Sequence, residues 1–422
     1  MALLLTHAAE LLTLAGGDRA RRGPELGDIG MVRDGAVLFA EGKVLRAGST
    51  DEVARGLPGD LGPVEERNCR GMIVAPGLVD SHTHLVFAAP RLDDYEQRLA
   101  GATYTEIAAA GGGIHSSVAR LREAETGQLA ASAHHWMNAA RACGTTTIEV
   151  KSGYGLALEA ERRSLQAAAR AAAAAGMDAP RTFLGAHVVP RGADRAAYLD
   201  EIVEAMIPAF TGTEAKDYAP EFADAFCDPS AFTLEECRRV LLQARIHGLK
   251  LKLHAEQFGH IGGIGLGIEL GAVSVDHLDS ATAADAALLG RAQTVATLIP
   301  GANFFLGQPY PPARELIGAG AAVALATDFN PGTCPILSLP LVMSIACSGM
   351  RLSPAEAWSA ATINGAAALG RAAVCGSLTP GKRADAAIFA VDDHRAIPYF
   401  AGHNLCHAVV QGGHWRNTAA CA

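Results

Sequence analysis

The chain has 422 residues and a formal net charge of −9, and 50% of its residues are hydrophobic while 5% are aromatic. This size and composition exclude a disordered chain and favour one large domain with a smaller one, because an α/β barrel alone takes about 250 residues. The 35 lysines and arginines are scattered and form no basic stripe, which argues against nucleic acid as a partner.

Both ends of the chain are predicted to be rich in β-strands. Short β segments separated by turn residues occur at 35–40, 43–46, 384–390 and 407–413. We expect residues 1–72 and 373–422 to form one small β-sandwich domain together, on either side of a barrel domain at 73–372.

Between these ends, apolar strand candidates alternate with alanine-rich helical segments. The strand candidates are 145–150, 181–187, 249–254, 273–277, 294–298 and 322–327, and helical stretches such as 158–175 and 234–247 lie between them. Apolar strands separated by helices predict a parallel sheet that is buried on both faces. The predicted fold class is therefore α/β, a (β/α)₈ TIM-like barrel with the small β-sandwich domain attached.

Four residues that could bind a metal follow predicted strands. His82 and His84 end the apolar run from Ile73, and if that run is a strand their side chains point the same way. His254 and Asp328 end two later runs. The C-terminal strand ends of a TIM barrel carry its catalytic groups, so these four side chains are expected to converge. Three imidazoles and one carboxylate suit Zn²⁺ or a non-haem iron ion in a hydrolytic site.

Cysteine usage and hydropathy predict a soluble, cytoplasmic protein with no membrane partner. The nine cysteines form no Cys-x-x-Cys pair and are odd in number, which is typical of reduced thiols. No apolar run approaches the ~20 residues that a membrane span needs. The apolar start of the chain has no preceding basic residue and is soon followed by Glu10, so it fits a signal peptide poorly.

Longer motifs resemble the amidohydrolase superfamily, whose members carry His-x-His after the first barrel strand and an aspartate after the last. The matching segments are 75–87, 111–114, 149–156, 254–258 and 326–333. The most specific of them, Lys-Ser-Gly-Tyr-Gly and Thr-Asp-Phe-Asn-Pro-Gly-Thr, resemble the members that act in histidine degradation. This resemblance implies hydrolysis of the cyclic amide of 4-imidazolone-5-propanoate to N-formimino-L-glutamate. It also implies one metal ion per chain, Zn²⁺ or Fe³⁺, and a homodimer.

The resemblance also implies roles for individual residues. His82, His84, His254 and Asp328 match the metal ligands, Asp328 could also accept the proton of the attacking water, and His277 is the candidate that polarises the carbonyl or shuttles a proton. Arg91 matches the arginine that holds the substrate's propanoate, since a guanidinium binds a carboxylate in bidentate fashion. The further residues that match substrate contacts are Tyr154, His187, Gln257, Asn330, Gly332 and Thr333.

Three alternatives remain open at this stage. Metal-dependent deaminases commonly use His-x-x-Glu to shuttle a proton, but here Gln257 takes the place of the glutamate. A dihydroorotase-like enzyme needs a modified lysine and two metals, whereas Lys151 lies in a motif that resembles one-metal enzymes. A catalytically inactive barrel that serves as an assembly module is disfavoured, because all four candidate ligands are present.

Overall fold

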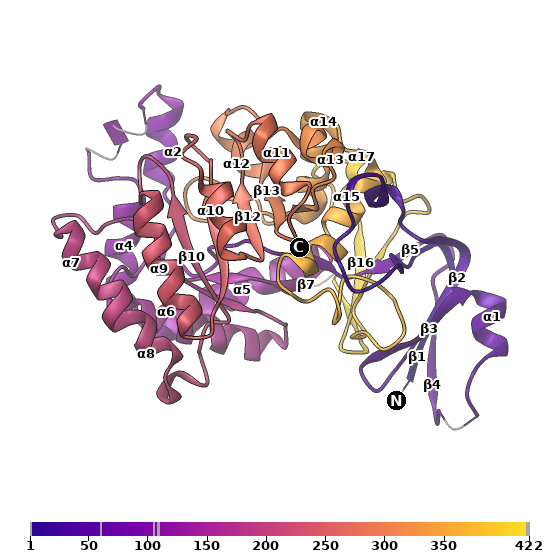
Figure 1. The fold of residues 1–422 in the computed structure, drawn as a ribbon. Coiled ribbons are helices and arrows are strands. Elements are labelled where there is room, and N and C mark those ends of the chain that lie inside the picture. Colours follow the sequence, from indigo (N-terminus) through magenta and orange to yellow (C-terminus); the bar gives the residue numbers. More distant parts are fainter. Residues whose placement is uncertain (1, 60, 104–105, 108–109, 419–422) are drawn as a thin grey trace.

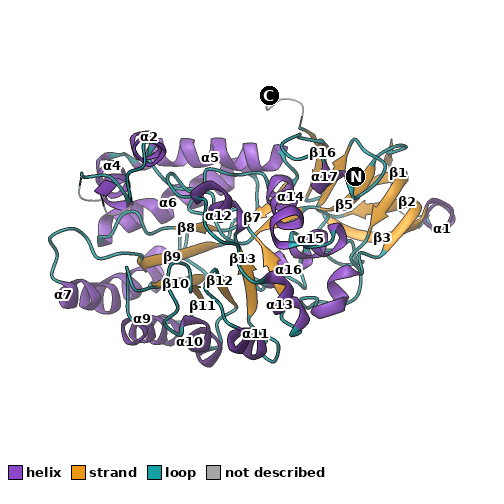
Figure 2. Cartoon of the chain, turned by 90° about the horizontal axis from the view of Figure 1, so that it is seen from above, coloured by secondary structure: helices purple, strands orange, loops and turns teal. Residues whose placement is uncertain are grey.

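The computed structural model describes residues 2–59, 61–103, 106–107 and 110–418. It consists of a body of parallel strands covered by helices and of a mostly antiparallel sheet beside this body (Figure 1). Seen from above in Figure 2, the helices surround the strands of the body and the second sheet extends to one side. The predicted α/β class is confirmed.

The body is built on a curled parallel sheet of seven strands in the order β14-β13-β12-β11-β10-β9-β8. The strands are β8 (Val150–Lys151), β9 (Arg181–Ala186), β10 (Phe222–Cys227), β11 (Lys250–Ala255), β12 (Ser274–His277), β13 (Val295–Leu298) and β14 (Val323–Leu325). All except β10 overlap strands predicted from the sequence, although the strand predicted at 145–150 is divided between β8 and the preceding strand at 145–148. The apolar run of β10 is interrupted by the buried Asp224. Nearly every strand residue is buried, as expected for a parallel sheet covered by helices.

Further contacts bring the two edges of the curled sheet toward each other, as in a closed barrel. β6 (Leu78–Asp80) pairs in parallel with β7 (Thr145–Ile148), which leads directly into β8. Beyond β6, Thr83 forms a parallel bridge with Phe329, and the His84 amide donates to the Phe329 carbonyl at 2.9 Å. The segment after β14 therefore lies beside the segment after β6, and this arrangement fits the predicted TIM-like barrel.

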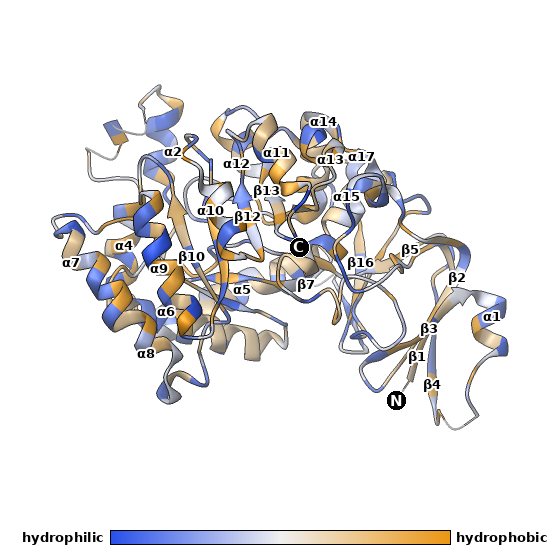
Figure 3. Ribbon diagram, in the orientation of Figure 1, coloured by the Kyte–Doolittle hydropathy of each residue, from blue (hydrophilic) through white to orange (hydrophobic). Residues whose placement is uncertain are grey.

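Helices on the outside of the body show the amphipathic pattern that this position requires (Figure 3). In α6 the buried residues are mostly alanines, and the helix ends at Gly176 with a left-handed φ of 60°. In α9 the Thr233 side chain accepts from the Glu236 amide in a capping box. The helices are α2 (Leu92–Leu99), α4 (Ile114–Glu123), α5 (Thr126–Ala142), α6 (Leu158–Ala175), α7 (Arg195–Asp200), α8 (Ile207–Thr211), α9 (Leu234–Ile246), α10 (Gly263–Leu270), α11 (Ala283–Leu289), α12 (Pro300–Leu306), α13 (Ala313–Gly318), α14 (Leu339–Met350), α15 (Pro354–Ala360) and α16 (Ile363–Ala367).

The second sheet joins the two ends of the chain. Its order is β17-β16-β15-β5-β1-β2-β3, with β4 paired to β1. The strands are β1 (Ala2–Leu12), β2 (Met31–Ala40), β3 (Lys43–Ser49), β4 (Val64–Asn68), β5 (Ile73–Pro76), β15 (Ala386–Phe389), β16 (Cys406–Gln411) and β17 (His414–Asn417), and the small helices α1 (Thr50–Arg55) and α17 (Ala396–Tyr399) flank them. These strands form one sheet, so the β-sandwich and the three domain boundaries stay predictions.

The apolar run from Ile73 to His84 is not one strand. The expectation that the His82 and His84 side chains share a face assumed a single strand here, and this assumption is wrong. β5 belongs to the end sheet and β6 to the barrel, with Gly77 between them. A Cβ on Gly77 would lie 2.0 Å from Thr146 Oγ1, so only glycine fits this crossing. The two histidines lie beyond β6, where pairing with Asp328 and Phe329 still keeps the backbone extended.

No helix in the described ranges is long and apolar enough to cross a membrane. No disulfide bond joins two of the eight described cysteines, and the ninth, Cys421, lies outside the described residues.

Candidate active site and metal centre

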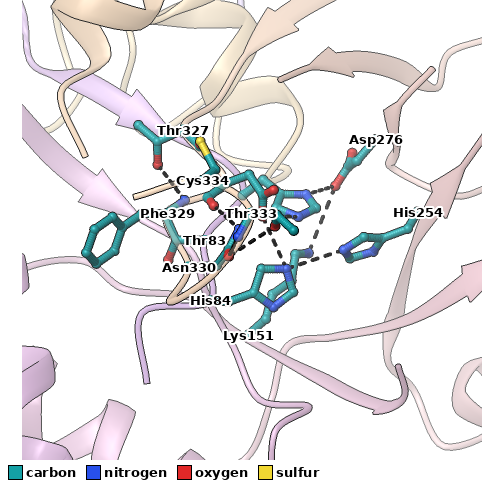
Figure 4. Close-up of polar contacts among 12 residues, drawn as sticks. Thr83, His84, Lys151, His254, Asp276, Thr327, Phe329, Asn330, Thr333 and Cys334 are labelled. Carbon is teal, nitrogen blue, oxygen red and sulfur yellow. Dashed lines mark hydrogen bonds and ion pairs between the residues drawn. The ribbon is translucent and has the colours of Figure 1, made fainter. Parts of the chain in front are cut away.

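Four side chains from different segments of the barrel converge on one buried point. His84 Nε2 lies 3.4 Å from His254 Nε2 and 3.4 Å from Asp328 Oδ1 (Figure 4). His82 Nε2 lies 3.6 Å from the same oxygen of Asp328. The structure thus brings together all four residues that the sequence suggested as metal ligands, at the C-terminal ends of their strands.

Two carboxylates orient two of these imidazoles. Asp276 Oδ2 lies 2.6 Å from His82 Nδ1, and Asp224 Oδ2 lies 3.0 Å from His254 Nδ1. A carboxylate at Nδ1 fixes the ring so that the lone pair of Nε2 faces the centre. His82 Nε2 is buried and has no hydrogen-bond partner. An imidazole nitrogen that is oriented and buried but left without a partner is what a metal ligand requires.

Burial keeps His82 and His84 neutral. It lowers the pKa of His82 and of His84 well below the usual range, with a further contribution from nearby positive groups. The pKa of His187 falls to about 3 for the same main reason. Burial also raises the pKa of Asp328 well above its ordinary value. A cation at the centre would compensate for the cost of burying this carboxylate in its charged form.

The donor set fits a metal ion in spacing as well as in chemistry. Tetrahedral zinc with bonds of about 2.0–2.1 Å sets its ligands roughly 3.3–3.4 Å apart. The measured separations of 3.4 to 3.6 Å lie close to this spacing. Three imidazoles and one carboxylate also suit iron, so the donors alone do not distinguish the two metals.

A cavity opens above this centre and is lined by most of the residues expected to contact a substrate. Those that line it are His84, Arg91, Tyr154, His187, His254, Gln257, His277, Asp328, Asn330 and Thr333. Gly332 lines the neighbouring cavity instead, and His82 lies beneath the floor with no exposed surface. Non-glycine residues with positive φ, His277 at 83° and Asp328 at 50°, turn two side chains toward this space.

Asn330 and His187 both have an internal partner. Asn330 Oδ1 accepts from the amides of Gly332 and Thr333 at 2.9 and 2.7 Å, and its Nδ2 donates to the Asp328 carbonyl at 2.7 Å. It therefore shapes the loop that carries Asp328. His187 Nδ1 lies 3.0 Å from the Gly153 carbonyl, so this nitrogen carries the hydrogen and Nε2 is left as an acceptor. Their contacts with a substrate stay predictions.

Arg91 is buried against Gly332. Only 8% of its surface is exposed, and its Nε is buried without a hydrogen-bond partner. A Cβ added to Gly332 would lie 2.0 Å from the guanidinium carbon and from two of its nitrogens. Because Gly332 has no side chain, there is room for the Arg91 guanidinium beside it.

A Gly332→Ala variant is expected to displace the Arg91 guanidinium and to weaken carboxylate binding about tenfold, since a charge-assisted hydrogen bond contributes about 1.5–3 kcal/mol. The measurement is KM for the carboxylate substrate together with metal content, which should not change. Gly265→Ala in α10 is the matched control, because nothing lies within 4 Å of its added Cβ. An unchanged KM in the Gly332 variant would contradict this role.

From the sequence, Lys151 is left out of the metal site and expected to have a structural or electrostatic role, but the four charged residues around it are missed. Lys151 Nζ lies 2.9 Å from Glu149 Oε1 and 2.7 Å from Asp224 Oδ2. It is 3.9 Å from Asp276 Oδ2 (Figure 4). Lys252 Nζ lies 3.5 Å from the same Asp276 oxygen. All five side chains are completely buried. In the sequence each of them is only a charged residue inside an apolar strand. Such a pattern predicts an exposed side chain equally well.

Comparison with known proteins agrees with this geometry. The amidohydrolase family matches residues 73–413. An imidazolonepropionase from Solibacter usitatus is 43% identical over 97% of both chains, and one from Geobacillus thermodenitrificans is 42% identical over 97% of both. The chain belongs to the imidazolonepropionase group of the amidohydrolase family.

Solved structures of other amidohydrolase-type enzymes share the fold. An adenosine deaminase from Xanthomonas campestris, solved with bound zinc, has a TM-score of 0.71 at 18% identity and covers 99% of this chain and 95% of its own. A guanine deaminase from E. coli has a TM-score of 0.73 at 16% identity and covers 99% of each chain. At such low identity the likeness extends to the fold alone. It supports the TIM-like barrel of this amidohydrolase.

Proposed function

We propose that this amidohydrolase hydrolyses the cyclic amide of 4-imidazolone-5-propanoate to N-formimino-L-glutamate in histidine degradation. The observation that carries the proposal is the cavity, which places the buried Arg91 guanidinium and the His–Asp centre on one small space. A substrate that fits needs a carboxylate at one end and a hydrolysable group at the other. The full-length relatives named imidazolonepropionase support this choice of substrate.

The roles of the residues follow from their positions. Arg91 holds the propanoate, and His187 and Tyr154 orient the ring from the cavity wall. His82, His84, His254 and Asp328 would hold one Zn²⁺ or Fe³⁺ ion, and the bound ion would supply an activated water and polarise the amide carbonyl.

Proton transfer falls to residues of the chain. Asp328 Oδ1 faces the histidines, which leaves Oδ2 free to take a proton from the attacking water. A carbon–oxygen bond forms, the ring carbon–nitrogen bond breaks, and the proton passes to the leaving nitrogen. His277, which also lines the cavity, donates a hydrogen bond to the carbonyl oxygen as charge develops there.

Deamination is disfavoured by the surroundings of two residues. Gln257 lines the cavity but cannot titrate. The neighbouring Glu256 has a carboxylate, but its Oε1 accepts from the amides of Gly262 and Gly263 at 2.7 and 2.8 Å, and its Oε2 accepts from Ile264 at 3.0 Å. This carboxylate is held by the start of α10 and is not available as a proton shuttle.

The decisive experiment is a spectrophotometric assay of purified protein on 4-imidazolone-5-propanoate combined with metal analysis. We expect turnover with one metal per chain, loss of turnover after chelation, and recovery with Zn²⁺ or iron. Two metals per chain, or turnover of a purine or of dihydroorotate in place of the imidazolone, would contradict the proposal. The homodimer and the cytoplasmic location stay predictions, and the former is checked by light scattering.

An Arg91→Ala variant is expected to raise KM for the propanoate substrate about 10- to 100-fold and to leave metal content unchanged. The reason is that the guanidinium is the cation that lines the cavity beside the metal centre. Arg55→Ala in the exposed helix α1 is the control for the loss of one positive charge. An Arg91 variant with the wild-type KM would remove this residue from substrate binding.

A further inference from the structure

A second cavity adjoins the substrate cavity on its outer side. It is lined by residues of α2, by Leu306 at the end of α12 and by the loop that carries Thr333. Arg91, Phe258 and Thr333 line both cavities, so they form the boundary between them. Phe258 is 52% exposed. We call this second space the outer cavity, because it adjoins the substrate cavity at the exposed ring of Phe258.

Arg98 brings a second guanidinium to this outer cavity. Its guanidinium carbon lies 4.5 Å from the centre of the Phe305 ring and 5.4 Å from that of Tyr95. These two rings stack at 5.3 Å with an angle of 13° between their planes. The stack holds the arginine between α2 and α12, so its position is fixed before any ligand arrives.

Both arginines have hydrogen-bond donors without partners. Arg98 Nη2 and Arg91 Nε are buried, and neither has a hydrogen-bond partner. Burial and the nearby charge of Arg91 lower the pKa of Arg98, while Tyr95 and Asp94 raise it. Asp94 also lines the cavity, but its Oδ2 accepts from the Gly113 amide at 2.8 Å and is engaged with the start of α4. Two neighbouring guanidiniums with free donors form a site suited to an anion.

We infer that the outer cavity is a second carboxylate site, in which Arg98 acts together with Arg91 on a small dicarboxylate. The inference rests on the proposed function. Ring opening turns an amide into a carboxylate, so the substrate carries one carboxylate and the product carries two. As the product moves outward, its propanoate passes from Arg91 to Arg98, and the new carboxylate, which forms at the His–Asp centre, takes its place on Arg91.

Calorimetric titration of the metal-loaded enzyme with glutarate and with butyrate tests this site directly. Glutarate has two carboxylates on a five-carbon chain and butyrate has one, so wild-type enzyme should bind glutarate more tightly. Arg98→Met removes the charge but keeps an unbranched apolar side chain beside the two stacked rings. It should weaken glutarate binding about tenfold, while butyrate binding and KM change less than about threefold. Arg98→Lys should retain most of the difference, and Arg55→Met should behave as wild type.

The outcomes separate this inference from the proposed function. Equal weakening of both probes in Arg98→Met would show that the arginine only holds α2 in place, and would overturn the second site. An unchanged preference for glutarate would overturn it as well. If the enzyme does not turn over the imidazolone at all, the proposed function fails, and the titration still reports whether the outer cavity binds a dicarboxylate.

Discussion

A His254→Ala variant is expected to bind its metal ion about 100-fold more weakly than the wild type and to lose nearly all hydrolytic activity. A four-ligand zinc site is worth roughly 10–16 kcal/mol, so one ligand of four accounts for on the order of 3 kcal/mol. His254 Nε2 lies 3.4 Å from His84 Nε2, and Asp224 Oδ2 lies 3.0 Å from its Nδ1, so the variant loses a donor that faces the centre. The measurement is competition with a chelator, followed by metal analysis and the imidazolone assay.

His260→Ala is the matched control for this variant. His260 follows six residues later, is exposed, and pairs with Asp285 at 2.8 Å, away from the centre. It should keep both metal and activity. The His254 variant should remain folded by circular dichroism, since Lys151 still pairs with Asp224. Retention of metal and turnover in His254→Ala would remove this residue from the centre and with it the assignment of four ligands.

Most of the barrel and the set of candidate ligands could be predicted from the sequence, because both depend on local patterns. Buried parallel strands appear as short apolar runs, and reactive residues follow them where strands end. His254 and Asp328 were found in this way, and the structure brings them together with His82 and His84. Convergence required that the carboxyl ends of these strands lie at the same end of the barrel.

What the sequence could not predict depends on long-range pairing. Lys250 and Lys252 occupy equivalent positions in an alternating run, yet the first is exposed and the second is completely buried beside Asp276. Nothing in the local pattern distinguishes them. The break at Gly77 is hidden for the same reason, since the contact with Thr146 that demands a glycine comes from a distant strand.

The buried charges behind the site lead to a second large effect. Lys151 lies within 3 Å of Glu149 and Asp224. Asp224 and Asp276 in turn lie 3.0 and 2.6 Å from the Nδ1 atoms of His254 and His82. Burial alone would lower the pKa of Lys151, but the three carboxylates raise it, so the amine stays protonated. A protonated amine cannot be carboxylated, which agrees with a centre of one metal.

Lys151→Met is expected to lower the free energy of unfolding by about 3–5 kcal/mol, because it leaves buried carboxylates without their cation. It should also weaken metal binding about 10- to 100-fold, since Asp224 and Asp276 would no longer be held against His254 and His82. The measurements are urea denaturation and chelator competition. Lys43→Met in the end sheet is the control, as Lys43 is exposed.

An Asp224→Asn change in the Lys151→Met background distinguishes charge balance from simple packing. If the lysine acts by neutralising the carboxylates, removing one negative charge should recover part of the lost stability, and the two changes should be less than additive. If Lys151 only fills space, the second change should add its own cost in full, because Asp224 also lies against His254. Additive losses would therefore contradict the electrostatic role of Lys151. They would also show that Asp224 orients His254 without help from Lys151.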